Sequence, residues 1–214
     1  MRLVMPRLYV ILDAARMRQS SEVTARQLID VGVRALQYRD KRGAAREFLR
    51  EATALAEMAR PGGADFFVND RPDIAVLSGA SGVHVGQDDL SVEQARALVG
   101  AERWVGVSTH NEEQFRAALL TTADYIAVGP VFATKSKENP DPVVGLEFLR
   151  KMRSLTAKPI VAIGGITLQR AAEVSAAGAD SVAVISDILQ AAEPAQRAAE
   201  FLKILEAAKP ATSH

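Results

Sequence analysis

The feature that most constrains this chain is a regular alternation of short apolar runs with longer amphipathic segments. The runs are rich in Val, Ile, Phe and Tyr and nearly uninterrupted, which is typical of parallel strands buried on both faces. The strands predicted in this way are Arg7–Leu12, Val33–Arg39, Asp65–Asn69, Val83–Gly86, Trp104–Val107, Tyr125–Val128, Ile160–Ile163 and Val182–Ile185.

The segments between these runs are rich in Ala, Leu, Glu and Arg, and their apolar residues recur at i, i+3 and i+4. This spacing predicts amphipathic helices. Ser91 with Gln94 and Thr167 with Arg170 have the spacing of helix N-terminal caps. The predicted helices are Ser20–Val31, Arg46–Ala59, Ser91–Leu98, Glu112–Leu120, Leu146–Leu155, Thr167–Ala176 and Pro194–Ala208.

Strict alternation of strand and helix without a long linker favours a parallel α/β fold. Eight units in 214 residues average about 27 residues each, close to one unit of a (β/α)8 barrel. A doubly wound open sheet usually carries a G-x-G-x-x-G turn after its first strand, whereas here Leu12-Asp13-Ala14-Ala15 contains no glycine. We therefore expect one α/β domain over residues 1–214, folded as a TIM barrel.

The composition excludes several classes of function. Lys and Arg (26) balance Asp and Glu (26), so there is no basic excess that would indicate nucleic acid or membrane partners. The chain has no cysteine, which excludes disulfides, thiol catalysis and Cys-based metal sites. Pro6, Arg7 and Asp13 interrupt the apolar N-terminal segment, so neither a secretory signal nor a membrane span of ~20 residues is expected. We expect a cytoplasmic protein with small-molecule partners, and the sequence leaves open whether it forms a homo-oligomer.

Functional residues of a (β/α)8 barrel lie at the carboxyl ends of its strands. At the end of the second predicted strand, period-two alternation places Gln37, Arg39 and Lys41 on one side. Val33 and Ala35 precede them on that side, so an apolar layer gives way to an amide and two cations. An exposed charged loop is the alternative interpretation.

Carboxylates follow the next two predicted strands, as Asp70 and as the Asp88-Asp89 pair. Neighbouring strands deliver them to the same rim, where they repel each other unless a cation lies between them. Mg²⁺ suits a site with few protein ligands, because it retains waters and phosphate oxygens. Taken alone, each carboxylate is equally well explained as a cap of the following helix. His84, within the fourth predicted strand, is expected to be a packed core residue.

The other half of the rim carries candidate anion-binding groups. Ser108 and His110 follow the fifth predicted strand, as a candidate hydrogen-bonding group and a candidate acid–base group. In barrels, phosphate often binds backbone N–H groups after strands seven and eight. Gly164-Gly165 and Ile185-Ser186 stand at those places, although a tight turn alone would also use glycine. The segment Pro130–Gly145 is long enough to form a mobile lid.

Seven short motifs occur in a specific order and spacing. They are QYRDK (Gln37–Lys41), ND (Asn69–Asp70), HVGQDD (His84–Asp89), GVS (Gly106–Ser108), GPVFATKSK (Gly129–Lys137), GGIT (Gly164–Thr167) and VISDI (Val184–Ile188). With these motifs the chain resembles thiamine phosphate synthase from Leu8 to about Leu205. This resemblance implies a transferase of thiamine biosynthesis. The family joins 4-amino-2-methyl-5-hydroxymethylpyrimidine diphosphate to 4-methyl-5-(2-phosphoethyl)thiazole and releases thiamine phosphate and pyrophosphate.

The resemblance also implies a role for each matching residue. Contacts to the pyrimidine diphosphate are implied for Gln37, Arg39, Lys41 and Asn69, and Mg²⁺ ligation for Asp70 and Asp89. Binding of the thiazole phosphate is implied for Thr134, Ser136, Gly165, Ile185 and Ser186. Places near the reacting diphosphate are implied for Ser108 and Lys137, which with Arg39 form the implied catalytic set. The implied mechanism is dissociative, with Mg²⁺-assisted loss of pyrophosphate before the thiazole nitrogen attacks.

This chain departs from the family pattern at a few positions. The family commonly has Thr-Asp where this chain has Leu12-Asp13, and Pro and Thr where it has Ala133 and Ser136. Two other functions remain open for such a barrel: a thiazole tautomerase, with which His110 is also compatible, and a non-catalytic module that binds thiazole phosphate. The diphosphate and metal residues favour the synthase, and a carboxylated thiazole phosphate is a further candidate acceptor.

Overall fold

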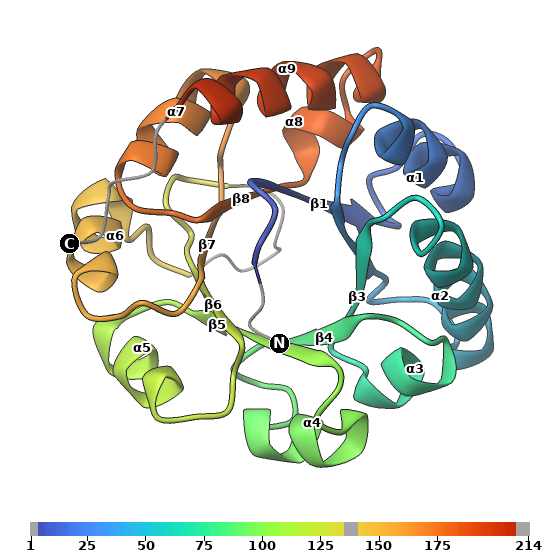
Figure 1. Ribbon diagram of the computed structural model, residues 1–214, viewed down its shortest axis with the longest axis horizontal. Helices are drawn as coiled ribbons and strands as arrows, with labels where there is room; N and C mark the ends of the chain where they lie inside the picture. Colours follow the sequence, from blue (N-terminus) through green and yellow to red (C-terminus); the bar gives the residue numbers. More distant parts are fainter. Residues whose placement is uncertain (1–3, 135–140, 209–214) are drawn as a thin grey trace.

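The computed structural model describes residues 4–134 and 141–208. Eight parallel strands follow one another around a closed barrel, and β1 pairs with β8 to complete it (Figure 1). The expected single-domain (β/α)8 architecture is confirmed. The strands are β1 (Leu8–Asp13), β2 (Ala35–Arg39), β3 (Asp65–Asn69), β4 (Gly82–Val85), β5 (Trp104–Thr109), β6 (Tyr125–Val128), β7 (Ile160–Ile163) and β8 (Ser181–Val184).

Helices surround the barrel and cover the outer face of its strands (Figure 1). Two of them, α3 and α8, were not predicted, because helices of six and four residues are too short to show a repeated apolar spacing. In the described residues the helices are α1 (Ser21–Asp30), α2 (Ala45–Ala59), α3 (Pro72–Leu77), α4 (Val92–Val99), α5 (Glu112–Leu119), α6 (Gly145–Arg153), α7 (Leu168–Ala176), α8 (Ser186–Leu189) and α9 (Pro194–Ala207).

The predicted helix caps are confirmed at one site and corrected at the other. Ser91 and Gln94 form a reciprocal capping box at the start of α4. Thr167 occupies the N-cap position of α7, but its side chain makes no capping hydrogen bond. Among the described residues, no helix is both long and apolar enough to cross a lipid bilayer.

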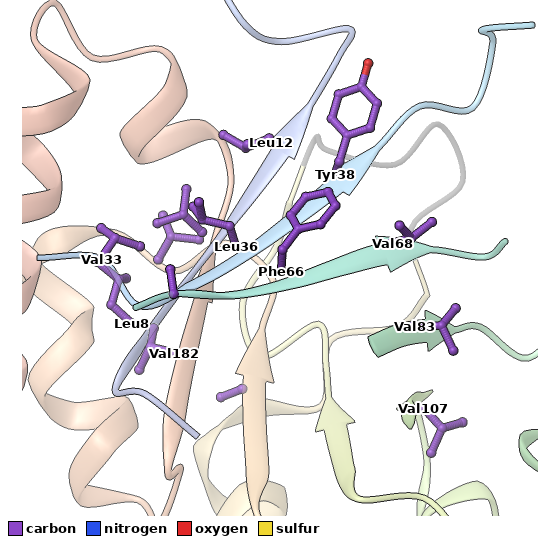
Figure 2. Packing of buried hydrophobic residues seen from close by; sticks show 14 of the residues in the cluster. Leu8, Leu12, Val33, Leu36, Tyr38, Phe66, Val68, Val83, Val107 and Val182 are labelled. Atoms are coloured by element: carbon purple, nitrogen blue, oxygen red, sulfur yellow. The ribbon is translucent and has the colours of Figure 1, made fainter. Parts of the chain in front are cut away.

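The main apolar core lies between the outer face of the strands and the surrounding helices. Alternate strand residues such as Leu8, Leu12 and Leu36 project from the barrel into this layer (Figure 2). Val33 also packs here, so its predicted place inside the barrel is wrong. The strand begins only at Ala35, and period-two alternation therefore does not extend back to Val33. Ala35 does lie in the interior cluster, as expected.

The interior of the barrel forms a second apolar cluster, built around three aromatic rings. Tyr9, Phe67 and Tyr125 pack together with ring centroids 5.4–6.2 Å apart. Met5 belongs to this cluster and precedes β1, so it fills the barrel from the amino ends of the strands. The opening that remains must therefore lie at the carboxyl ends of the strands.

Candidate active site

A cavity of about 720 Å³ lies at the carboxyl ends of the strands. It brings together residues of seven strands and the segment that follows β6. Among the residues singled out in the sequence, its lining includes Gln37, Arg39, Asn69, Ser108, Thr134, Gly165, Ile185 and Ser186. Ser136 and Lys137 lie outside the described residues, as do the other residues of 135–140 within the segment expected to form a lid.

Arg39 is held at the cavity wall by an ion pair with Asp13. Its Nη1 donates to Asp13 Oδ2 at 2.6 Å, and Asp13 is only 2% exposed. The second carboxylate oxygen of Asp13 accepts from the backbone N–H of Ala15 at 3.0 Å. Because a guanidinium carries five N–H donors, pairing through Nη1 leaves others to bind an anion. This role of Asp13 was not predicted from the sequence, although its place at the end of β1 was a signal.

Lys41, Asp70 and Asp89 form a charged cluster beside the cavity. The Lys41 ammonium makes an ion pair with Asp70. The backbone of Asp70 adopts φ 63°, a left-handed conformation that non-glycine residues rarely adopt, and its N–H donates to His84 O at 2.8 Å. Asp70 directly follows Asn69, which lines the cavity, so the cluster adjoins the cavity wall.

The two carboxylates of this cluster lie within hydrogen-bonding reach of each other. Burial and the neighbouring Asp70 carboxyl raise the pKa of Asp89, while the backbone N–H of Gly86 and the Lys41 charge oppose this shift. Asp89 Oδ2 accepts from that Gly86 N–H at 2.8 Å. The predicted convergence of Asp70 and Asp89 is therefore present, and a further cation between them would relieve their repulsion.

This donor set fits Mg²⁺ better than a transition metal. Within the described ranges, no group of three or more His, Cys, Asp or Glu side chains could hold a metal ion. Mg²⁺ commonly takes only one or two carboxylates and completes its shell with waters and substrate phosphates. A carboxylate pair next to a cavity lined with cations and amides offers that combination.

The opposite wall of the cavity contains the two turns after β7 and β8. Gly165 has φ +62°, and a Cβ at this position would lie 2.4 Å from Ala133 O, so the turn requires glycine. Arg170, which also lines the cavity, donates from Nη1 to Gly165 O at 2.9 Å and lies 4.3 Å over the Phe132 ring. From the sequence, Arg170 was predicted only as part of a helix N-terminus, because it lies within α7 and not at the end of a strand.

A chain of buried polar side chains runs below the cavity floor. Gln37 Nε2 donates to Tyr9 Oη at 2.9 Å, and Tyr9 Oη lies 3.2 Å from Tyr125 Oη. His84 Nδ1 lies 3.0 Å from Tyr125 Oη, and His84 Nε2 lies 2.8 Å from Ser108 Oγ. His84 is buried, as expected, but it also lines the cavity and contacts a candidate site residue.

His110, the candidate acid–base group, also lines the cavity. Its Nδ1 lies 2.6 Å from Gly129 O, which fixes the proton on that nitrogen in the neutral ring. Its Nε2 lies 3.5 Å from Asp141 Oδ2. The histidine thus joins the end of β5 to the segment that leads into α6.

The fold and the cavity define the class of this protein, a (β/α)8 barrel with a cavity at the carboxyl ends of its strands, where enzymes of this fold have their active sites. A family model described as thiamine monophosphate synthase matches residues 8–188. The chain belongs to the thiamine-phosphate synthase family. Its members condense a pyrimidine diphosphate with a thiazole phosphate to form thiamine phosphate, a transfer of an alkyl group.

Individual relatives agree with this membership. The thiamine-phosphate synthase of Koribacter versatilis is 54% identical over 208 residues, which cover 95% of this chain and 97% of that one. The thiamine phosphate pyrophosphorylase from Pyrococcus furiosus has a solved structure that superposes with a TM-score of 0.87 at 34% identity, covering 94% and 96% of the two chains. A 3-hexulose-6-phosphate synthase from Salmonella typhimurium shares the fold alone, with a TM-score of 0.72 at 20% identity.

The Asp13–Arg39 pair generates a prediction about stability. Replacing Asp13 with Asn leaves the Arg39 guanidinium without its buried counter-charge, and we expect the free energy of unfolding to fall by about 1–3 kcal/mol. Urea denaturation at pH 7 measures the loss. Asp73→Asn is the matched control, since Asp73 pairs with Arg71 on the surface, where such pairs contribute about 0–1 kcal/mol. Equal losses in the two variants would show that the buried pair has no special role.

Proposed function

We propose that this chain makes thiamine phosphate from 4-amino-2-methyl-5-hydroxymethylpyrimidine diphosphate and 4-methyl-5-(2-phosphoethyl)thiazole, with Mg²⁺ as cofactor. The observation that carries the proposal is the arrangement of one cavity between two anion-binding walls. One wall has Arg39 and Asn69 next to the carboxylate pair, and the other has the Gly165 and Ser186 turns. This arrangement suits two phosphorylated substrates, one of which carries a metal ion.

The pyrimidine diphosphate occupies the wall formed by β2, β3 and β4 in this proposal. Gln37 and Asn69 bind through their amides, and Arg39 and Lys41 neutralise the diphosphate. Asp70 and Asp89 hold Mg²⁺, which when bound neutralises charge on the departing pyrophosphate. Lys41 pairs with Asp70 in the structure, so this lysine lies where it can contact both the metal ligands and the diphosphate.

The thiazole phosphate occupies the opposite wall. Backbone N–H groups at Gly165 and Ile185 and the hydroxyl groups of Thr134, Ser136 and Ser186 bind its phosphate. Glycine at position 165 supports this assignment, because only a residue without a Cβ leaves room beside Ala133 O. The cavity volume of about 720 Å³ lies within the usual range of small-molecule sites.

The reaction then proceeds by dissociation. The bond between the methylene carbon and the diphosphate oxygen breaks, and pyrophosphate leaves with the electron pair. The electron-rich aminopyrimidine stabilises the methylene cation, and the thiazole nitrogen attacks it to form the new carbon–nitrogen bond. Arg39, Ser108 and Lys137 stabilise charge that develops on the leaving group, and the barrel holds the two substrates in line. No nucleophilic side chain is required, which agrees with the absence of cysteine.

The direct test is incubation of the purified chain with both substrates and Mg²⁺, followed by chromatographic assay of thiamine phosphate and pyrophosphate. We expect the two products in equal amounts, and none of either without Mg²⁺. Parallel reactions contain the thiazole phosphate tautomer alone or a carboxylated thiazole phosphate as acceptor. Conversion of the tautomer without any condensation product would identify a tautomerase, and binding without turnover of either kind would identify a binding module.

The carboxylate pair generates a separate prediction. Asp70→Ala and Asp89→Ala each remove one of the two proposed metal ligands. We expect each to lower kcat/KM by about 100-fold or more and to raise the Mg²⁺ concentration needed for activity. Loss of a residue that only supports a metal ligand already lowers metal affinity or activity by about 10–100-fold. Mg²⁺ titration of initial rates measures both effects. Asp88→Ala is the control, because the neighbouring Asp88 side chain is exposed. An unaltered Mg²⁺ dependence in the two variants would remove the metal assignment.

Lys137 is predicted to act on the transition state rather than on binding. We expect Lys137→Ala to lower kcat by about 100-fold while the KM for thiazole phosphate stays within about threefold, because its partner charge develops only as the bond breaks. Ser186→Ala provides the contrast and should raise that KM with little effect on kcat. Steady-state kinetics with each substrate varied in turn separate the two patterns. A loss confined to KM in Lys137→Ala would contradict the proposed role.

A further inference from the structure

The buried chain of side chains below the cavity connects two proposed substrate contacts. It begins at Gln37 and ends at Ser108, both of which line the cavity. Tyr9, Tyr125 and His84 lie between them, and these five side chains make consecutive contacts of 2.8–3.2 Å. The central three residues have no assigned part in the reaction, so their function requires a separate account.

The orientation of the Gln37 amide sets the direction of the first hydrogen bond, and a continuous relay passes that direction to the others. An amide nitrogen donates and does not accept, so the hydroxyl proton of Tyr9 cannot be directed toward Gln37 Nε2. With Tyr9 accepting from Gln37, a continuous relay has Tyr9 donating to Tyr125 and Tyr125 donating to His84 Nδ1. The neutral His84 ring then carries its proton on Nε2 and donates it to Ser108 Oγ.

This direction also determines what the two ends offer to a ligand. Ser108 accepts from His84, so its own hydroxyl proton is available to the cavity and can bind a phosphate oxygen. Gln37 uses one N–H on Tyr9 and retains its carbonyl oxygen and its second N–H. A carbonyl and an N–H side by side match the edge of an aminopyrimidine, where a ring nitrogen accepts beside an amino group that donates. A 4-oxopyrimidine presents the opposite order and requires a flipped amide.

We infer that Tyr9, Tyr125 and His84 are positioning residues that hold the Gln37 amide in the orientation specific for a 4-aminopyrimidine. This inference deepens the proposed function and rests on it, because it places the pyrimidine ring at Gln37. A flip of the amide to accept a 4-oxopyrimidine reverses all the hydrogen bonds of the chain together. It also turns the Ser108 proton away from the cavity, where the anionic diphosphate requires a donor. Recognition of the diphosphate and of the amino group is thus coupled.

The surroundings of the chain keep its members in place and uncharged. Tyr9 and Tyr125 are 1% and 0% exposed, and burial raises the pKa of both phenols above the usual range, so both keep their protons at neutral pH. His84 stacks on the Tyr125 ring at a centroid distance of 5.6 Å. A Cβ on Gly106 would lie 2.4 Å from the Tyr125 hydroxyl, so the glycine of the GVS motif makes the space that this hydroxyl occupies.

The protein has three tyrosines, two inside the hydrogen-bonded chain and one outside it, and they allow a matched experiment. Tyr9→Phe and Tyr125→Phe each remove one hydroxyl from the relay with little change in volume. Tyr38→Phe is the control, because Tyr38 projects from β2 into the outer layer (Figure 2), where its ring packs against Phe48. Titration calorimetry with Mg²⁺ measures the affinity of each protein for the pyrimidine diphosphate and for its 4-oxo analogue. Thermal unfolding verifies that each variant is folded.

We expect the unsubstituted chain and Tyr38→Phe to prefer the amino compound. In Tyr9→Phe and Tyr125→Phe this preference should fall by about tenfold or more, because the amide can then flip without reversing a relay. An unchanged preference overturns the inference, and so does an equal loss of affinity for both compounds, which would indicate a merely structural role. Formation of thiamine phosphate by the unsubstituted protein tests the proposed function separately. That activity does not depend on the ratio of the affinities for the 4-amino and 4-oxo compounds.

Discussion

Closure of eight parallel strands into one barrel is the constraint on which the rest of the structure depends. Each strand pairs with its neighbours in the chain, and the β1–β8 pairing completes the ring. Because all strands run in one direction, their carboxyl ends meet at a single rim. The interior is filled by aromatic rings and closed by Met5 on the amino side. Residues far apart in the sequence are thereby brought around one cavity of about 720 Å³.

The charged groups at this rim are held by partners before any substrate binds. Asp13 fixes Arg39, and Asp70 both pairs with Lys41 and approaches Asp89. In the reaction that we propose, such groups need little reorganisation when charge develops on the leaving pyrophosphate. The hydrogen-bonded tyrosines and His84 extend the same principle to the neutral polar contacts of the site.

Much of the fold and part of the candidate site could be predicted from local sequence patterns. Continuous apolar runs predicted all eight strands, three of them with their observed ends, and alternation placed Gln37 and Arg39 toward the cavity. Prediction was wrong at Val33, where the strand had not yet begun, and incomplete at α3 and α8, which are too short for periodicity to show. The roles assigned to Ser136 and Lys137 stay predictions, since both lie outside the described residues.

The sequence by itself determined the strand and helix order, the barrel class and the residue types at each strand end, because these follow from spacing within short segments. Only the tertiary structure decided which side chains pair. Tyr9 and Tyr125 are 116 positions apart, and Asp13 and Arg39 are 26 apart. Such contacts depend on the register between strands and on closure of the barrel, which together decide which residues of different strands lie at the same level along the barrel axis. No pattern within either segment contains that information.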